Sequence, residues 1–278
     1  MTYVIFKHCI YYSNRAEQTS AVHLSGPYTI QVVQCLFLRN IDKEAFGSLY
    51  AKDFIHAFSF SCLFATNTPY ILHIREGRNV VTKNWFLFFL KFFCQSYFKH
   101  GDGAKFQNLA LCIIINSHFM QNCGGSINVY SADRFIASNN TVRKNKVTGE
   151  GGAINMIEIS INVTIYRCVI YQNTANTAGG GVSIINANNI NLRYTRLISN
   201  KAWTGASGGP GGGMNIAIFS YITIAFSIFQ ENTGLTAGGA LLIENPNIYH
   251  KSSVFFSITF FILERISHMT PILESSAI

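Results

Sequence analysis

A short sequence element recurs roughly every 27 residues along the chain, and this repeat limits the fold more than any other feature. Each copy begins with cysteine or another small polar residue, has an apolar residue two positions later and ends with asparagine three positions after that, as in Cys35, Phe37 and Asn40. The step from Asn67 to Asn122 is about twice the period, which indicates one decayed copy between them. The asparagines that end the copies are Asn14, Asn40, Asn67, Asn122, Asn145, Asn173, Asn200 and Asn232.

Two other elements share this period. A glycine pair leads into a segment of alternating apolar residues, and a second alternating pair, such as Val163 and Ile165, precedes each copy by a few residues. Alternation with a period of two is typical of strands with one buried face, so each period is expected to hold two or three short strands. Cys94 and Phe98 have the position expected for the decayed copy. The glycine segments are residues 124–129, 151–156, 179–184, 212–216 and 238–243.

A unit of this length cannot bury its own apolar face, whereas stacked copies can, because each strand pairs with the equivalent strand of the next unit. We therefore expect an all-β, parallel β-helix solenoid over residues 1–262, with about nine to ten rungs. Its rungs should be degenerate over 1–110 and clear over 111–262, followed by a C-terminal tail at 263–278. Propellers and β-sandwiches fit this period less well. The apolar position of the repeat should form an interior column, namely Tyr11, Phe37, Phe64, Phe119, Val142, Ile170, Leu197 and Phe229.

The repeat also predicts what occupies the corners of each rung. The asparagines should stack at the bend that follows the interior column, where their amides can hydrogen-bond along the solenoid axis. Asparagine also tolerates the left-handed backbone that a tight turn requires. The glycine pairs should supply the next corner, where positive φ or close backbone approach excludes a Cβ atom.

The combination of a Gly-Gly-Ala segment, as at 151–153, with a Phe-x-x-Asn segment, as at 37–40 and 229–232, resembles the repeat of polymorphic outer membrane proteins. The resemblance covers most of the chain and is sharpest over 112–245. It implies the right-handed parallel β-helix of the pectin-lyase-like group, and a surface or secreted, adhesin-like role without a catalytic motif. The implied location is extracellular or at the cell surface, although no secretory signal is visible in the sequence.

Composition and charge exclude several other classes of protein. Hydrophobic residues make up 49% of the chain and charged residues 12%, which argues against disorder and against a coiled coil. The net charge is +8, but the basic residues are scattered, so no nucleic-acid partner is expected. The one tight basic group is interpreted as a solvated turn, with contact to phosphate or an anionic glycan as the alternative. That group consists of Arg143, Lys144 and Lys146.

Two dense apolar runs, at 85–93 and 254–263, are too short to span a membrane as helices. We expect them to be buried strands, so that a membrane link would need an anchor outside them.

Four of the seven cysteines, Cys9, Cys35, Cys62 and Cys168, occupy the same position of the repeat. Their spacing does not match a zinc-binding CxxC pattern, so no metal site is expected. They are interpreted as a column of small buried thiols, because serine or threonine replaces them in other copies. Disulfides between neighbouring rungs, in an oxidising compartment, are the alternative.

No catalytic site is expected, because polysaccharide lyases and hydrolases need clustered carboxylates and the acidic residues here are scattered. The pairs nearest to a cluster are Asp42 with Glu44 and Glu150 with Glu158. We therefore predict a non-catalytic, adhesin-like or structural module without a cofactor. The alternatives are a divergent polysaccharide lyase or hydrolase of the pectin-lyase-like group, and a fragment of a larger surface protein in which Ile258 takes the place of the next asparagine.

Two features are candidate binding sites for a glycan or protein ligand. Trp203 lies in the longest turn, a glycine-rich insertion at 201–211, where its indole could stack on a sugar or a partner protein. The preferred interpretation, however, is a surface loop in which the indole folds back onto the solenoid. The second feature is a flat strip of outward-facing polar residues, which suits weak, repeated contacts. Uncapped ends would also leave self-association open. The strip comprises Asn128, Asn155, Ser183 and Asn215.

Overall fold

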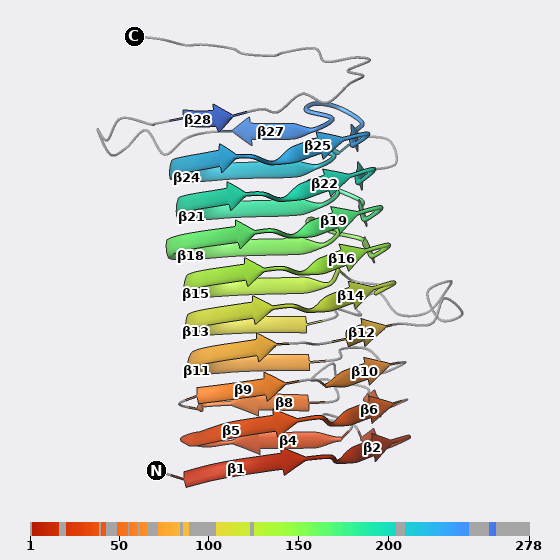
Figure 1. Ribbon diagram of the computed structural model, residues 1–278, viewed down its shortest axis with the longest axis vertical. Coiled ribbons are helices and arrows are strands. Elements are labelled where there is room, and N and C mark those ends of the chain that lie inside the picture. Colours follow the sequence, from red (N-terminus) through yellow and green to blue (C-terminus); the bar gives the residue numbers. More distant parts are fainter. Residues whose placement is uncertain are drawn as a thin grey trace.

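Successive turns of the chain pile up along one axis, so that each strand lies beside the equivalent strand of the next turn (Figure 1). The described residues form strands and turns and contain no helix. The computed structural model describes residues 2–16, 21–38, 40–42, 49–54, 56–60, 62–65, 72–83, 86–88, 104–122, 125–203, 209–244 and 256–259.

The largest sheet has 13 strands and runs the length of the solenoid. Its neighbouring strands are parallel, and equivalent residues of successive turns lie opposite each other, as Ile127, Ile154 and Val182 do. Its main path is β1 (Thr2–Lys7), β5 (Tyr28–Val33), β9 (His56–Phe60), β11 (Leu72–Lys83), β13 (Ala104–Ile115), β15 (Ile127–Ser138), β18 (Ile154–Tyr166), β21 (Val182–Arg193), β24 (Met214–Ala225) and β27 (Leu241–Glu244). Off this path lie β4 (Val22–Ser25), β8 (Leu49–Lys52) and β28 (Phe256–Thr259).

A second sheet stacks nine short strands in the same parallel manner. They are β2 (Ile10–Tyr12), β6 (Leu36–Leu38), β10 (Leu63–Ala65), β12 (Phe86–Phe88), β14 (His118–Met120), β16 (Thr141–Arg143), β19 (Val169–Tyr171), β22 (Arg196–Ile198) and β25 (Ile228–Gln230). Two small sheets contain β17 (Lys146–Val147), β20 (Thr174–Ala175), β23 (Lys201–Ala202) and β26 (Thr233–Gly234), and β3 (Arg15–Ala16) with β7 (Ile41–Asp42). The predicted parallel stacking of repeat units into an all-β solenoid is therefore confirmed.

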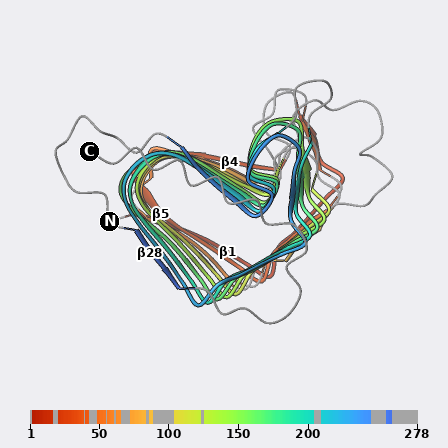
Figure 2. The same cartoon turned by 90° about the horizontal axis from the view of Figure 1, so that it is seen from above.

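The two alternating segments of a period form one long strand where two short strands were expected. From β13 to β24, each long strand contains a residue with a left-handed backbone near its middle, with φ between 52° and 61°. This bend lets a single strand line two sides of the cross-section (Figure 2). The residues at the bend are Asn108, Ser131, Glu158, Asn186 and Ile218.

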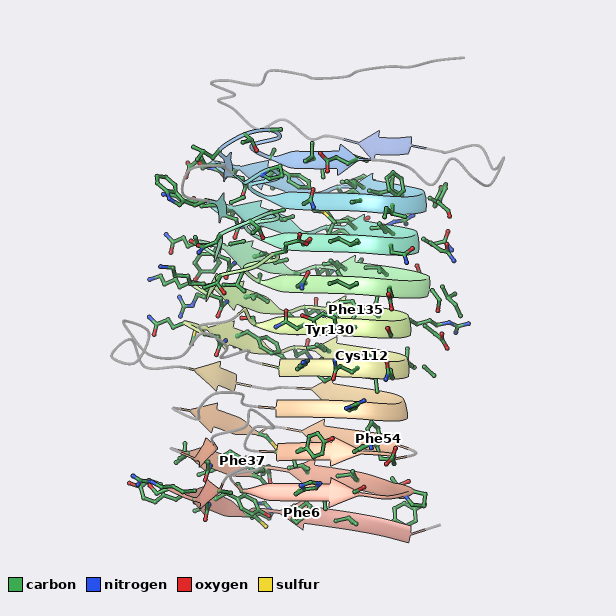
Figure 3. The ribbon with its side chains drawn as sticks, turned by 180° about the vertical axis from the view of Figure 1, so that it is seen from behind. Phe6, Phe37, Phe54, Cys112, Tyr130 and Phe135 are labelled. Atoms are coloured by element: carbon green, nitrogen blue, oxygen red, sulfur yellow. The ribbon has the colours of Figure 1, made fainter. Side chains whose placement is uncertain are left out.

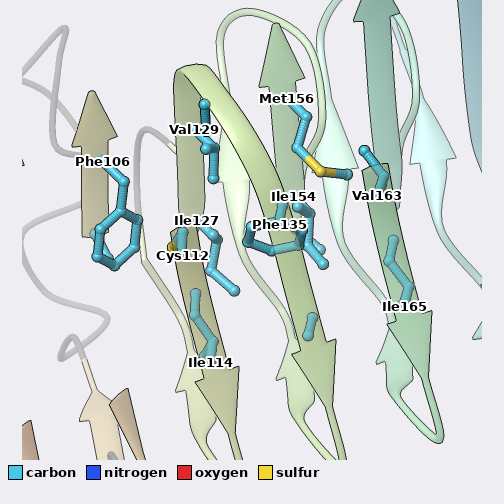
Figure 4. Close-up of a cluster of buried hydrophobic side chains, with 14 of the residues drawn as sticks. Phe106, Cys112, Ile114, Ile127, Val129, Phe135, Ile154, Met156, Val163 and Ile165 are labelled. Atoms are coloured by element: carbon cyan, nitrogen blue, oxygen red, sulfur yellow. The ribbon is translucent and has the colours of Figure 1, made fainter. Parts of the chain in front are cut away.

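The strand register confirms the interior column. Tyr11 pairs with Phe37 at one end of the second sheet, and Leu197 pairs with Phe229 at the other. The rings of Tyr11 and Phe37 stack with centroids 4.7 Å apart. Phe37 and Phe135 are almost fully buried and lie inside the solenoid (Figure 3). Figure 4 shows how apolar side chains from successive long strands meet in this core.

The decayed copy lies closer to the preceding copy than the sequence indicates. Phe64 pairs with Leu87, and Leu87 pairs with Phe119, so β12 supplies the missing rung. The prediction that Cys94 and Phe98 mark this copy was wrong in register, and both residues lie outside the described part of the chain. The long step falls after β12, where the pairing partner of Phe86 is His118.

Both dense apolar runs contain strands, as expected: β12 lies in the first run and β28 in the second. In β28, Ile258 pairs with Ile224 of β24. The prediction that Ile258 occupies the asparagine position was therefore wrong, because Ile224 belongs to the long strand that precedes the asparagine. The tail at 263–278 lies outside the described residues.

The predicted asparagine ladder is present wherever its asparagines are described. The backbone N–H and the Nδ2 group of Asn145 both donate to Oδ1 of Asn173, at 3.0 and 2.8 Å. Nδ2 of Asn173 donates to Oδ1 of Asn200 and to the carbonyl oxygen of Val142, both at 3.0 Å. The same pattern links Asn14 to Asn40, Asn122 to Asn145, and Asn200 to Asn232, while Asn67 lies outside the described residues.

The left-handed residue of this corner precedes the asparagine, which corrects the expectation that asparagine itself adopts that backbone. Each of these residues has φ between 52° and 57°. The asparagine is therefore selected for its amide, which satisfies buried backbone groups, and not for its tolerance of positive φ. The left-handed residues are Ser13, Gln121, Lys144, Gln172, Ser199 and Glu231.

The glycine corner is confirmed, and close backbone approach explains it. Gly179 has φ +62°, as the prediction requires. Gly180 has an ordinary φ, but a Cβ atom there would lie 2.3 Å from the carbonyl carbon of Lys201 and 2.5 Å from the carbonyl oxygen of Gly212. Neighbouring turns pack backbone against backbone at this point, so any side chain would force them apart.

The cysteine position is a column of hydrogen-bonded thiols, which confirms the preferred interpretation for the described cysteines. Cys9, Cys35, Cys62 and Cys168 form no disulfide. The Sγ atom of Cys168 donates to the carbonyl oxygen two residues earlier, as the hydroxyl of Ser227 does in its own rung. Any small donor can fill this position, which explains why serine and threonine replace cysteine.

Candidate binding surfaces

The predicted polar strip is not on the surface. Asn128, Asn155, Ser183 and Asn215 alternate with core residues and lie opposite one another in register, as expected. Their exposed fractions, however, are 3%, 7%, 0% and 4%. The prediction that they form an exposed strip was therefore wrong, and a ligand in solution cannot reach them.

The glycine-rich turns cover this strip. A Cβ atom on Gly151 would lie 2.8 Å from Cβ of Asn155, and one on Gly211 would lie 2.9 Å from Cβ of Asn215. Glu150, in the turn before β18, accepts a hydrogen bond of 3.0 Å from the hydroxyl of Ser183. Seen along the axis, the turns curl back toward the starts of the long strands (Figure 2). Alternation in the sequence identified the outward face but could not show that another segment covers it.

Trp203 is exposed. Its side chain has an exposed fraction of 57%, and its backbone N–H donates to the carbonyl oxygen of Ala175 at 2.7 Å. The indole therefore stands on an anchored backbone and is exposed, so the preferred interpretation that it folds back onto the solenoid was wrong. Residues 204–208 of this turn lie outside the described chain.

The two carboxylates of the second predicted pair, Glu150 and Glu158, stay apart. Glu150 and Glu158 lie at different corners, because four residues of extended strand, about 13 Å, separate Ile154 from Glu158. Glu158 accepts a hydrogen bond of 2.6 Å from Ser131, one turn away. In the described part of the chain, no three His, Cys, Asp or Glu side chains are grouped so as to hold a metal ion. The side chains of Asp42 and Glu44 are not among those described.

The predicted basic group does not act as one unit. Arg143 lies on the outer side of β16, where its Nη1 donates to the hydroxyl of Tyr171 at 2.7 Å and its Nε contacts the sulfur of Met120 at 2.8 Å. Lys144 occupies the left-handed corner, and Lys146 is exposed in β17. Arg143 is thus partly engaged by its neighbours, while the two lysines project from a turn, as the solvated-turn interpretation predicts.

A group of exposed arginine and aromatic side chains, which the sequence analysis missed, gathers at the corner between the long strands and the second sheet. Each turn contributes three positions: the end of the long strand, the left-handed corner residue and the first residue of the short strand. In three successive turns, residues at the same position lie opposite one another. We call this group the Tyr-Arg patch. It consists of Tyr166, Arg167, Arg193, Tyr194, Arg196 and Phe226.

The rings of the patch are ordered by contact with one another. Tyr194 stacks on Phe226 with centroids 4.9 Å apart and planes 9° apart. Tyr166 meets Tyr194 edge-on at 5.6 Å, and the guanidinium of Arg167 lies 5.0 Å from the centre of the Tyr166 ring. Tyr194 and Phe226 nevertheless keep exposed fractions of 47% and 43%. Aligning the repeats on their asparagines would have placed these residues at equivalent positions, which is the signal available in the sequence.

The buried thiols contrast with this surface. Desolvation by burial raises the pKa of Cys168 to about 11 and also raises that of Cys112. Such thiols remain protonated near neutral pH and lack the reactivity of a catalytic cysteine.

Among the described residues there is no helix of sufficient length and apolar character to cross a membrane. Comparison of the chain with protein-family models, with curated proteins and with solved structures returned no match. The structure therefore establishes an all-β, parallel β-solenoid, and the resemblance to polymorphic outer membrane protein repeats stays a hypothesis.

Proposed function

We propose that this chain is a non-catalytic binding module, a right-handed β-helix of nine to ten rungs that acts at the cell surface or in secreted form. Its ligand is a glycan or a protein with a repeated surface. The observation that carries this proposal is the Tyr-Arg patch, in which three exposed arginines and the aromatic rings of three neighbouring turns share one corner of the solenoid. Tyrosine and arginine are the residues enriched where proteins bind partners.

The solenoid supports this role because it holds equivalent side chains in register. A linear or repetitive ligand presents equivalent groups at intervals, so several weak contacts add along the axis. Trp203 offers a second exposed aromatic contact on an anchored backbone. The separation of Glu150 from Glu158 supports a binding role over hydrolysis at that predicted pair, because hydrolysis requires two carboxyl groups within one site.

A glycan array probed with the full chain tests the proposal. We expect binding to a subset of glycans, with loss of signal in Tyr194→Ala or Trp203→Ala. Tyr3→Ala is the matched control, because Tyr3 is 56% exposed but lies on β1, at the opposite end of the solenoid. Depolymerisation of a polysaccharide by the wild-type chain would contradict the non-catalytic role, and uniform absence of glycan binding would exclude a glycan as the ligand.

A further inference from the structure

We propose that the Tyr-Arg patch recognises an acidic polysaccharide, in which carboxylate or sulfate groups recur along a linear chain. This inference rests on the proposed binding function and names the ligand class of the same surface. It follows from the charge of the patch, the arrangement of its rings and its position on the solenoid.

The patch carries three exposed guanidinium groups, on Arg167, Arg193 and Arg196. None of them forms a salt bridge with a described residue, although the chain does contain such a pair, between Lys52 and Asp53 at 3.7 Å. A guanidinium group binds a carboxylate, phosphate or sulfate through two parallel hydrogen bonds, so these side chains are suited to anionic partners.

Among the described residues, those next to the patch carry no opposing charge. The equivalent positions of the preceding turn are Ser138, Asn139 and Thr141, and the remaining positions of the three turns are Val169, Ala225 and Ile228. The nearest described carboxylate along the chain belongs to Glu231, which accepts hydrogen bonds from Ser199 and Gln230 at the next corner. The local field is therefore positive, in a chain whose other basic residues are scattered.

Two aromatic rings of the patch occupy costly backbone positions. Tyr194 and Phe226 are the left-handed corner residues of their turns, each with φ 53°. The same corner holds Asn116 and Asn139 in earlier turns, and asparagine adopts this backbone more readily than a bulky aromatic residue. An unfavourable conformation that places a ring on the surface is typical of a functional site.

The ring arrangement favours a sugar over a nucleic-acid base. A base needs an open ring face on which to stack. Tyr194 and Phe226 cover one face of each other, and Arg167 lies over the ring of Tyr166. The edge of Tyr166 also meets the ring of Tyr194, so stacking, edge-on and guanidinium contacts already occupy part of these ring surfaces. Ring edges and phenol hydroxyl groups can contact the C–H and hydroxyl groups of a sugar while the arginines bind its acidic groups. Turns that stack at about 4.8 Å present these groups as a linear row.

Binding of the full chain to immobilised polymers tests the inference. The probes are alginate as a polyuronate, heparin as a sulfated polysaccharide, the propylene glycol ester of alginate as the uncharged counterpart, and single-stranded oligo-dT. We expect binding to alginate or heparin, whichever anionic group fits, and at least tenfold weaker binding to the ester. The double variant Arg193→Gln/Arg196→Gln should weaken binding to the acidic polymer at least tenfold, and Arg196→Lys should weaken it less, because the charge remains while the two-point geometry is lost.

The controls separate this inference from the proposed function. Arg134→Gln removes an exposed arginine elsewhere on β15 and should leave the affinity unchanged. Equal binding to the esterified polymer, equal binding to oligo-dT, or an unchanged affinity in the double variant would overturn the acidic polysaccharide while leaving a binding module in place. Absence of binding to these polymers and to every glycan of the array would overturn both this inference and the glycan ligand of the proposed function.

Discussion

The turns at 104–244 and those at 2–88 share the same stacked strands but differ in what fills their corners. From Asn122 to Asn232 each asparagine is bonded to the next, and a glycine turn precedes each long strand from β15 to β27. In the N-terminal turns, β4 and β5 are separate strands, with Gly26 at φ 130° between them, and the glycine pair is absent from the sequence. Both regions nevertheless continue the same interior column.

This difference indicates that burial and strand pairing specify the stack, whereas corner chemistry determines how regular each turn is. The ladder shows the point clearly at Asn122, whose buried Oδ1 has no hydrogen-bond partner among the described residues. The sequence has Leu90 at the position of the preceding turn that would supply the donor, three residues after Leu87. The interior column passes through this interruption without a change of register.

The largest effect should follow removal of a ladder amide in the regular region. Asn173→Ala leaves the amide of Asn145, the Oδ1 atom of Asn200 and the carbonyl of Val142 without their buried partner. We expect the free energy of unfolding to fall by about 4 kcal/mol. Asn14→Ala, on an exposed residue of the first turn, should cost about 1 kcal/mol. Denaturant unfolding followed by circular dichroism measures both, and equal losses would remove the energetic difference between the two regions.

A methyl group at the glycine corner should have the next largest effect. Gly180→Ala places Cβ within 2.5 Å of two backbone segments, so we expect a loss of about 3 kcal/mol. Gly149→Ala is the matched control, because nothing lies within 4 Å of its added Cβ and its φ is ordinary. That variant should change stability by less than about 0.5 kcal/mol. A well-folded Gly180→Ala protein with unchanged thermal stability would show that the turns can separate without cost.

Alkaline pH should destabilise the regular region through its buried thiols. Burial raises the pKa of Cys168 from 9.0 to about 11, so between these values the unfolded chain loses a proton that the folded chain retains. Stability is therefore intact below pH 9 and falls as the pH rises toward 11, by about 1 kcal/mol for this thiol at pH 10. Urea unfolding at pH 8 and pH 10 measures the difference. Cys168→Ser should reduce the loss, and an identical pH dependence in that variant would exclude this thiol as its source.

The smallest effect should come from replacing the thiol at neutral pH. Serine occupies the same position at Ser117 and Ser227, where its hydroxyl donates to the carbonyl oxygen two residues earlier at 2.9 and 3.1 Å. Cys168→Ser keeps this bond, so we expect a loss below about 1 kcal/mol. Cys168→Val, which removes the donor, should cost more. The order of the thermal unfolding midpoints of Cys168→Ser and Cys168→Val decides whether the hydrogen bond or the side-chain volume matters more at this position.

The stack, the interior column and the asparagine ladder could all be predicted from the sequence, because each depends on matching residues one period apart. The decayed rung could not be predicted, because the positions two before and three after Leu87 lack the small residue and the asparagine that mark the other copies. The surface was also predicted poorly. Asn155 and Tyr194 occupy outer positions of the same solenoid, yet one is 7% exposed and the other 47%. Only the path of the glycine turns distinguishes them.

The sequence by itself determined that the chain forms a parallel stack, because a periodic pattern of small, apolar and amide residues has one arrangement that buries all copies at once. The tertiary structure alone decided which outward residues reach solvent. Exposure depends on where residues far apart in the sequence meet across neighbouring turns, as when Glu150 meets Ser183 and when Tyr166, Tyr194 and Phe226 converge from three successive turns. Because these contacts join residues about one repeat apart, no local stretch of sequence reveals them.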